Sequence, residues 1–152
     1  MTRSRISRRV FLDRMDWVDR MLSQIRALPL SDRPAFLSDP RNIGTAESCL
    51  RRALEAVFDA GRHLLAKGFA SGVSEYRQIA EGLVERGVLA PEEAGVMRIL
   101  AGYRNRLVHF YHEVTSEELY QICATQLGDV TRVTDALRRW VAAHSDLVDQ
   151  GP

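Results

Sequence analysis

This chain has little lysine, little cysteine and no long apolar run, and each shortage excludes a class of protein. Of its 21 lysine and arginine residues only Lys67 is a lysine, and the 20 acidic residues leave a net charge of +1. A chain so close to neutrality does not coat nucleic acid through its overall charge. Any contact with nucleic acid would therefore depend on a few arginines gathered in one place.

The two cysteines, Cys49 and Cys123, lie far apart in segments of helical periodicity, and we expect them to pack as small hydrophobic residues. The sequence contains no CxxC pair and no cysteine–histidine spacing typical of a metal site, so we expect neither a metal nor a cofactor. Acidic residues follow the basic N-terminus where a secretory signal would be apolar, and no apolar run reaches membrane-spanning length. We therefore expect a protein of the reducing cytoplasm that does not bind membranes.

The chain does contain enough apolar sequence for one packed domain. It is 152 residues long, with 45% hydrophobic and 27% charged residues, which is the size and balance of an ordinary globular unit. We expect a single domain over residues 1–152, in which residues 1–6 and 146–152 are flexible ends.

Apolar residues recur every three or four positions almost throughout the chain, which is typical of amphipathic helices. No segment shows the two-residue alternation of a strand. The sequence thus predicts an all-α protein, an up-and-down bundle of four long helices plus a short helix. We expect the long helices at about 7–28, 43–67, 91–107 and 115–141, and the short one at 74–87.

Residues that begin or end helices support these boundaries. Three prolines interrupt the helical pattern at 29–42, which is expected to be a loop with one short turn. Gly68 is expected to end the second helix, and Ser74 is a suitable N-cap for the short helix. Thr115 and Glu118 have the spacing of a capping box at the start of the last helix.

Residues 103–112, Tyr-Arg-Asn-Arg-Leu-Val-His-Phe-Tyr-His, carry the most informative pattern in the chain. At about 100° per residue, one side of this helix is apolar and predicts the face toward the core: Val96, Ile99, Leu100, Tyr103, Leu107 and Phe110. The other side is polar if the helix continues to residue 112: Arg104, Asn105, His109, Tyr111 and His112.

Three residues do not fit a simple solvent-exposed side. Met97, Ala101 and Val108 fall in the middle of the polar side, which indicates a surface that something else covers. Symmetric dimers are the commonest oligomers, so we expect a second copy of the chain to cover it. A homodimer would bring two sets of the polar residues to a shared groove.

Arg104, His109 and Tyr111 form the pattern R-x4-H-x-Y, which resembles the motif of HepT-like toxins, also called the DUF86 family, within the HEPN superfamily. Other segments also resemble that family, namely residues 52–64, residues 76–79 followed by 87–89, and residues 101–105. The resemblance covers roughly residues 8–145, which is most of the chain.

The resemblance implies a HEPN-like helical fold, a homodimer, and the role of toxin in a type II toxin–antitoxin system. Proteins of this kind are metal-independent endoribonucleases whose motif lies at the dimer cleft. The substrate would be RNA, either tRNA or mRNA, and Arg104, His109 and Asn105 would form the catalytic set. A MntA-type nucleotidyltransferase antitoxin would neutralise the toxin by adding adenylyl groups to Tyr111.

These residue types suit RNA cleavage without a metal. Histidine gains and loses a proton near neutral pH, so His109 can transfer protons in the reaction. Arg104 supplies a fixed positive charge for the phosphate of the transition state. Asn105 could orient either the phosphate or His109. An adenylyl group on Tyr111 would add bulk and negative charge beside them.

Other interpretations stay open at this stage. His109 could be a cation that stabilises a helix C-terminus, and Tyr111 could be an ordinary interface residue. Asp59 is a weaker candidate near the site, because it could instead pair with His63 one turn away. The whole chain could also be a non-catalytic HEPN helical module that binds a nucleotidyltransferase partner or a nucleotide.

Overall fold

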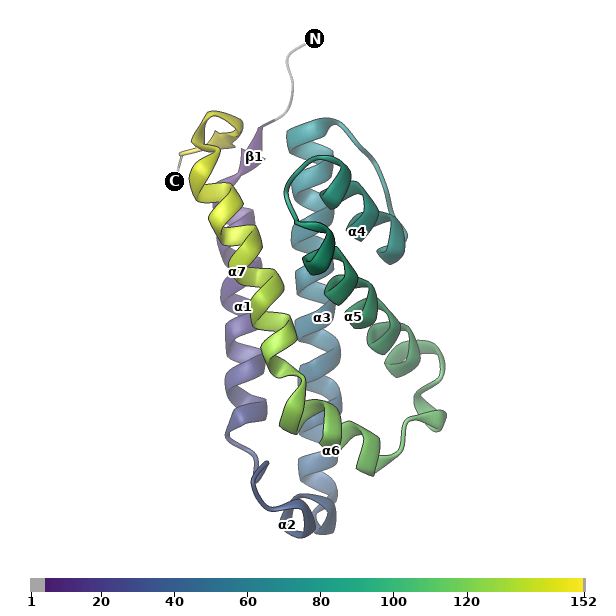
Figure 1. Ribbon diagram of the computed structural model, residues 1–152. Helices are drawn as coiled ribbons and strands as arrows, with labels where there is room; N and C mark the ends of the chain where they lie inside the picture. Colours follow the sequence, from purple (N-terminus) through teal and green to yellow (C-terminus); the bar gives the residue numbers. More distant parts are fainter. Residues whose placement is uncertain (1–4, 152) are drawn as a thin grey trace.

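The structure is a computed structural model that describes residues 5–151, an up-and-down bundle of helices (Figure 1). The prediction of an all-α bundle is confirmed. The elements in chain order are β1 (Ile6–Ser7), α1 (Arg8–Arg26), α2 (Arg33–Ser38), α3 (Pro40–Phe69), α4 (Tyr76–Glu85), α5 (Pro91–His109), η1 (Tyr111–Glu113), α6 (Ser116–Thr125), α7 (Leu127–Ala143), η2 (Ser145–Leu147) and β2 (Val148–Asp149).

The long helix α3 is the centre of the bundle, and it contacts α1, α2, α4, α5, α6 and α7. Figure 1 shows α1 and α7 on one side of α3 and the shorter α4 together with α5 on the other. The apolar stripe of α3 is buried along its whole length, from Ala46 to Leu65. These side chains belong to one continuous hydrophobic cluster, which fixes how the other helices are placed.

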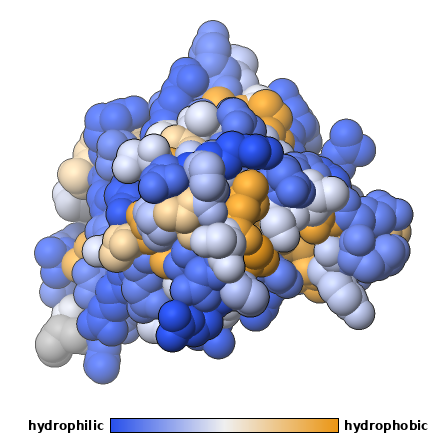
Figure 2. Space-filling view, turned by 90° about the horizontal axis from the view of Figure 1, so that it is seen from below, coloured by the Kyte–Doolittle hydropathy of each residue, from blue (hydrophilic) through white to orange (hydrophobic). Residues whose placement is uncertain are grey.

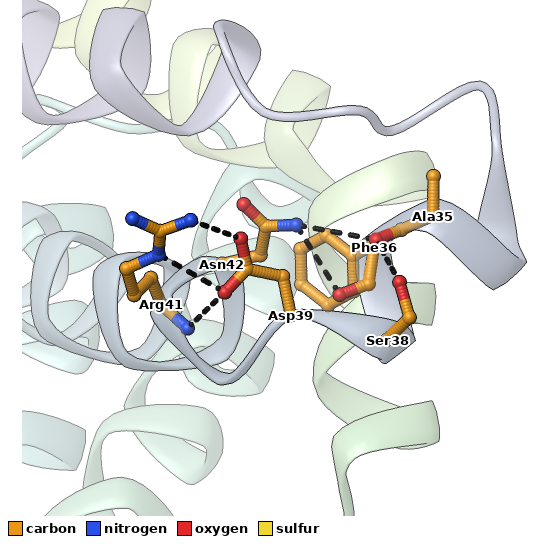
Figure 3. Close-up of polar contacts among 6 residues, drawn as sticks. All are labelled: Ala35, Phe36, Ser38, Asp39, Arg41 and Asn42. Atoms are coloured by element: carbon orange, nitrogen blue, oxygen red, sulfur yellow. Dashed lines mark hydrogen bonds and ion pairs between the residues drawn. The ribbon is translucent and has the colours of Figure 1, made fainter.

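The corner between α2 and α3 is more ordered than the predicted loop with one turn (Figure 3). Asp39 caps α3, because its carboxylate accepts hydrogen bonds from the backbone and side chain of Arg41 at 2.9 and 3.2 Å. Asn42 donates to the carbonyl oxygens of Ala35 and Phe36, which joins the two helices. The helix therefore begins at Pro40, a residue suited to the first turn, and not at residue 43.

The corner also holds the later part of the chain. The buried ring of Phe36 lies 5.1 Å from the ring of Tyr120 in α6. The Tyr120 hydroxyl donates a hydrogen bond of 2.5 Å to the carbonyl oxygen of Leu30. The segment before α3 therefore fixes α6, which in turn contacts the end of α5.

Two further predicted helix boundaries differ from the structure. The helix α3 continues past Gly68 to Phe69, and Ala70 takes the left-handed conformation that ends it, with φ 53°. Gly68 serves close packing instead, since a Cβ atom there would lie 2.9 Å from Cδ1 of Ile6. Glu75, not Ser74, occupies the N-cap position of α4, and its side chain makes no capping hydrogen bond.

The predicted last helix is two helices, α6 and α7, that meet at Gln126. Gln126 has φ −114° and ψ 0°, outside the values of a continuous helix. Thr115 caps α6 as expected, accepting a hydrogen bond of 3.1 Å from the backbone of Glu118. The Glu118 side chain does not complete the capping box, because it pairs with Arg106 of α5.

The described parts of the segments that we expect to be flexible, 1–6 and 146–152, include one short ladder. Ile6 pairs with Val148 in a two-residue parallel ladder, and both side chains are buried. The backbone N–H of Ser7 donates to Nε2 of His63 at 2.9 Å, and burial holds the pKa of His63 below its ordinary value. Residues 1–4 and 152 of the two predicted segments lie outside the described residues.

The surface seen from the α2 end is mainly hydrophilic, with hydrophobic side chains in areas interrupted by hydrophilic ones (Figure 2). None of the helices within residues 5–151 combines the length and the hydrophobicity that crossing a membrane requires. Cys49 and Cys123 are buried free thiols, and burial raises the pKa of Cys123 to about 12. Both are buried in the hydrophobic cluster, as predicted, and the Cys49 thiol also donates a hydrogen bond to Oε1 of Gln24.

Candidate functional site

The helix α5 carries the R-x4-H-x-Y pattern, and its buried side differs from the predicted one. Met97 and Ala101 are 0% and 1% exposed inside the single chain, whereas Ile99 and Phe110 are 52% and 48% exposed. The reason is that α3, α4 and α7 all pack against α5, so the covered side is wide and centred near Met97. Met97 and Ala101 therefore give no evidence for a second copy of the chain.

Arg104 lies on this inner side and not on the solvent side. Its guanidinium carbon is 4.4 Å from the centroid of the Tyr76 ring, a cation–π distance. The other face of Tyr76 stacks on Phe58 of α3, with centroids 4.4 Å apart and planes 13° from parallel. Phe58 is fully buried, so this stack attaches the position of Arg104 to the hydrophobic core.

Hydrogen bonding leaves Arg104 available to a ligand. Its Nη1 donates a weak hydrogen bond of 3.4 Å to Oδ1 of Asn105, and its Nε atom is buried without a partner among the described residues. No carboxylate pairs with it in that part of the chain. Burial raises the pKa of Tyr76, which the positive charge of Arg104 opposes.

A pocket of about 550 Å³ opens beside Arg104, between α3, the start of α4 and α5. Arginine is the main charged residue type in its wall. The lining residues are Arg62, Ser74, Glu75, Tyr76, Arg77, Arg104 and Asn105. This composition makes the pocket suited to a phosphate or another anion.

Arg62 joins α3 to the loop before α4. Its Nη1 donates to Asp59 at 3.0 Å and its Nη2 to the carbonyl oxygen of Ser74 at 3.1 Å. The structure thus pairs Asp59 with Arg62 and not with His63, and Asp59 lines two neighbouring pockets, not the one beside Arg104. Asp59 contacts the pocket through Arg62, and its negative charge also helps to raise the pKa of Tyr76.

His109 and Tyr111 lie at the end of α5. His109 is the last residue of the helix, and Phe110 leaves helical geometry with φ −130° and ψ 35°. Tyr111, in η1, is 64% exposed, and its ring meets the edge of His112 at 5.8 Å between centroids. The helix ends before Tyr111, so the condition that it continue to residue 112 is not met, and Tyr111 does not share a helix face with Arg104.

An ion pair positions this end of α5. Arg106 and Glu118 of α6 form a bidentate pair, one contact of which is 2.9 Å from Nη2 to Oε2. The hydrogen bonds of this pair lower the pKa of Glu118 and raise that of Arg106. His109 therefore extends from a helix end that is held on both sides, by α6 and by the core.

The structure brings Arg104 and Asn105 to one pocket, while His109 and Tyr111 lie at the exposed helix end beyond it. No hydrogen bond joins His109 to Arg104 within residues 5–151. No group of three or more His, Cys, Asp or Glu side chains in the same residues could hold a metal ion.

The sequence model described as Ribonuclease HepT-like matches residues 18–137 of the chain. The chain belongs to the HepT-like ribonuclease family. The matched segment contains the whole R-x4-H-x-Y pattern as well as Phe58, Arg62 and Tyr76. A comparison with curated proteins finds none that matches.

Three solved structures share the fold of this HepT-like chain. A tri-AMPylated HEPN toxin of Shewanella oneidensis, in complex with an MNT antitoxin, is 18% identical, with a TM-score of 0.76 over 86% of this chain and 97% of that one. YutE of Bacillus subtilis, a cytosolic protein of unknown function, is 17% identical, with a TM-score of 0.74 over 91% and 94%. A toxin–antitoxin structure with AMP-PNP is 16% identical, with a TM-score of 0.74 over 84% and 97%.

The sequence patterns missed two residues that line the pocket beside Arg104, Arg62 and Tyr76. Both come from elements that are distant from the motif in sequence, and they meet Arg104 only through the packing of α3 and α4 on α5. No helical periodicity or spacing joins positions so far apart. The signal available was indirect, since both residues lie in segments that resemble the HepT-like family.

Proposed function

We propose that this HepT-like protein is a metal-independent endoribonuclease, the toxin of a type II toxin–antitoxin pair. The observation that carries the proposal is Arg104, a cation without a carboxylate partner in the described chain, fixed by Tyr76 at the wall of a pocket. Asn105 lies in the same wall, and His109 follows one turn later on the exposed side of α5. Family membership supports the ribonuclease assignment.

In the proposed reaction, the ribose 2′-oxygen attacks the adjacent phosphorus and the bond from phosphorus to the 5′-oxygen breaks. The products are a 2′,3′-cyclic phosphate and a free 5′-hydroxyl, so no oxidant and no water molecule is consumed. His109 transfers the protons, since one is taken from the 2′-hydroxyl and one is given to the 5′-oxygen, by one His109 in turn or by the His109 side chains of two copies. Arg104 stabilises the additional negative charge on the phosphate in the transition state.

The protein would act as a homodimer through the outer side of α5. Ile99 and Phe110 are large exposed hydrophobic residues on this side, and Gly102 between them is exposed with open space around it. A second copy covering these residues would place two His109 side chains near one groove. This assigns the interface to a different side of α5 from the one that the sequence pattern suggested.

Tyr111 would be the site at which an MntA-type nucleotidyltransferase antitoxin attaches adenylyl groups. The supporting observation is its exposure of 64% in η1, two residues after the proposed catalytic His109. Addition joins the tyrosine oxygen to the α-phosphorus of ATP and releases pyrophosphate. The added phosphate would repel the RNA backbone and occupy the space beside His109.

RNA cleavage by the purified protein tests the proposed activity. Wild-type protein should cut tRNA or mRNA in the presence of EDTA, and His109→Ala and Arg104→Ala should lower the rate by at least about a hundredfold. Cleaved ends should carry a cyclic phosphate. A folded wild type that leaves both RNA classes intact would favour the non-catalytic HEPN module that binds a nucleotidyltransferase.

Co-expression with the cognate nucleotidyltransferase tests the regulatory assignment. Mass spectrometry should find one or more adenylyl groups on the peptide that contains Tyr111, and Tyr111→Phe should remain unmodified and toxic in the presence of the partner. His112→Gln is a matched control beside it. Adenylyl groups on a different residue would refute the assignment to Tyr111.

A further inference from the structure

The pocket beside Arg104 is more basic than one motif arginine requires. Three arginines line it, Arg62, Arg77 and Arg104, whereas Glu75 is its one acidic lining residue among the described part of the chain. Arg62 and Arg77 belong to neither the R-x4-H-x-Y pattern nor the hydrophobic core. Their position at this wall indicates a role other than contact with the reacting phosphate.

The hydrogen-bonding state of these arginines favours an anionic ligand. Arg62 uses its two terminal nitrogens on Asp59 and Ser74, but its Nε is buried and unpartnered within residues 5–151. Arg77 is exposed and forms no ion pair with any residue in that range. Arg77 thus leaves positive charge and N–H donors at this wall that a phosphate could use, beside an Arg62 whose charge is paired with Asp59.

The aromatic ring in the pocket is already covered on both faces. Phe58 stacks on one face of Tyr76, and the guanidinium of Arg104 lies over the ring, with that of Arg62 at 6.0 Å from the same centroid. A nucleobase therefore finds no open aromatic face for stacking. The contacts that remain are charge contacts, which bind the phosphate backbone of a nucleic acid and do not distinguish its bases.

We propose that Arg62 and Arg77 form a second phosphate subsite, which holds an RNA phosphodiester next to the one that Arg104 and His109 cleave. This inference rests on the proposed ribonuclease function and specifies its substrate contacts. The subsite positions single-stranded RNA without regard to base identity. It takes no part in proton transfer, because both arginines act on a phosphate that does not react.

Equilibrium binding tests the subsite without any need for cleavage. The probe is a fluorescently labelled single-stranded RNA of about 12 nucleotides, added to full-length protein with His109→Ala so that the RNA stays intact. In that background, Arg77→Gln and Arg62→Gln should each raise the Kd about three- to tenfold. Each should also reduce the slope of log K against log salt concentration by about 0.7, the value for one phosphate contact on a single strand.

A matched control separates the subsite from general charge. Arg33→Gln removes an exposed arginine on α2, at the far end of the bundle (Figure 1), and should leave the Kd unchanged. Arg62 also connects α3 to Ser74, so Arg62→Lys and a melting curve check the fold. Arg77 makes no such connection between elements, so the Kd measured for Arg77→Gln does not depend on a change in the fold. Equal Kd values for Arg77→Gln and Arg33→Gln would overturn the proposal.

Kinetics distinguish failure of the subsite from failure of the nuclease. With His109 intact, Arg77→Gln should raise KM with kcat within about twofold, because it removes binding and not chemistry. Normal cleavage with an unchanged KM would overturn the subsite alone. Absent cleavage with weakened RNA binding in Arg77→Gln would overturn the nuclease alone. AMP that competes as strongly as the RNA would identify a mononucleotide site and overturn the RNA subsite.

Discussion

Arg104 lies between two environments. Its helix, α5, packs against the core helices, while its guanidinium group lies at the wall of the pocket. The stack of Phe58, Tyr76 and Arg104 joins the centre of α3 to the proposed reaction centre. A flexible arginine loses much rotamer freedom when it binds a phosphate. Tyr76 removes part of that cost in advance, since it holds the guanidinium before a phosphate binds.

Substitution of Tyr76 tests this positioning role. Tyr76→Leu should lower kcat/KM for RNA cleavage about tenfold, because a cation–π contact is worth about 0.5–2 kcal/mol. Tyr76→Phe keeps the ring and should stay within about threefold of wild type. If the role of Tyr76 were purely structural, Tyr76→Leu and Tyr76→Phe would have the same kcat/KM when their melting temperatures are equal. Wild-type kcat/KM in folded Tyr76→Leu would disprove the positioning role.

At the residue scale, the sequence was informative about the motif and misleading about its surroundings. Arg104, Asn105, His109 and Tyr111 were proposed from the resemblance of the motif to the HepT-like family, and their roles stay a prediction. Periodicity placed Ile99 and Phe110 in the core and Met97 and Ala101 outside it, and the structure reverses this. The helix has apolar residues on two sides, so hydrophobicity alone could not decide which side packs on α3.

At the element scale, α3, α4 and α5 meet where small residues allow close approach. A Cβ atom on Gly61 of α3 would lie 2.9 Å from Cγ2 of Ile79 and 3.0 Å from Cδ1 of Leu83, both on α4. A Cβ atom on Gly82 of α4 would lie 2.9 Å from Leu65 of α3. Since α4 carries Tyr76, this close packing determines how Tyr76 meets Arg104.

Two alanine substitutions in α3 should therefore have opposite effects. Gly44→Ala meets open space and should stabilise the protein by about 1 kcal/mol through helix propensity alone. Gly61→Ala gains the same propensity but must displace Ile79 and Leu83, at a cost of about 1–3 kcal/mol. Thermal denaturation should show a higher Tm for the first and a lower Tm for the second. A higher Tm for Gly61→Ala would contradict the close packing.

The sequence predicted the existence of the long helices better than their ends. Periodicity continues from Leu119 across Gln126 to Val130, so nothing in the apolar pattern showed that α6 and α7 are separate helices. Gly68 looked like a helix end because glycine is common there. Its actual role depends on Ile6, a residue 62 positions earlier, and local sequence cannot reveal such a contact.

At the scale of the whole molecule, the proposed dimer depends on the outer side of α5. Gly102 offers a sensitive position, because a Cβ atom there meets nothing within 4 Å in its own chain. A large charged side chain at this position would leave the monomer intact and would disrupt a partner covering Ile99.

Gly102→Arg should accordingly convert a dimer to a monomer, as measured by sedimentation velocity, with no loss of helical content. Gly44→Arg is the matched control, since Gly44 is also an exposed helical glycine with open space but lies on α3. It should remain a dimer. A monomeric wild type, or a Gly102→Arg variant that still dimerises, would refute this interface.

The pairing of β1 with β2 has a consequence for how the chain reaches this structure. Ile6 and Val148 are partners across almost the whole described chain, so their contact closes a very long loop at an entropic cost. During synthesis, Ile6 emerges long before the residue that will pair with it. Its contacts with α3 can form early, but its ladder can be completed only after α7 has left the ribosome. Both chain ends therefore become ordered late, after the bundle between them has assembled.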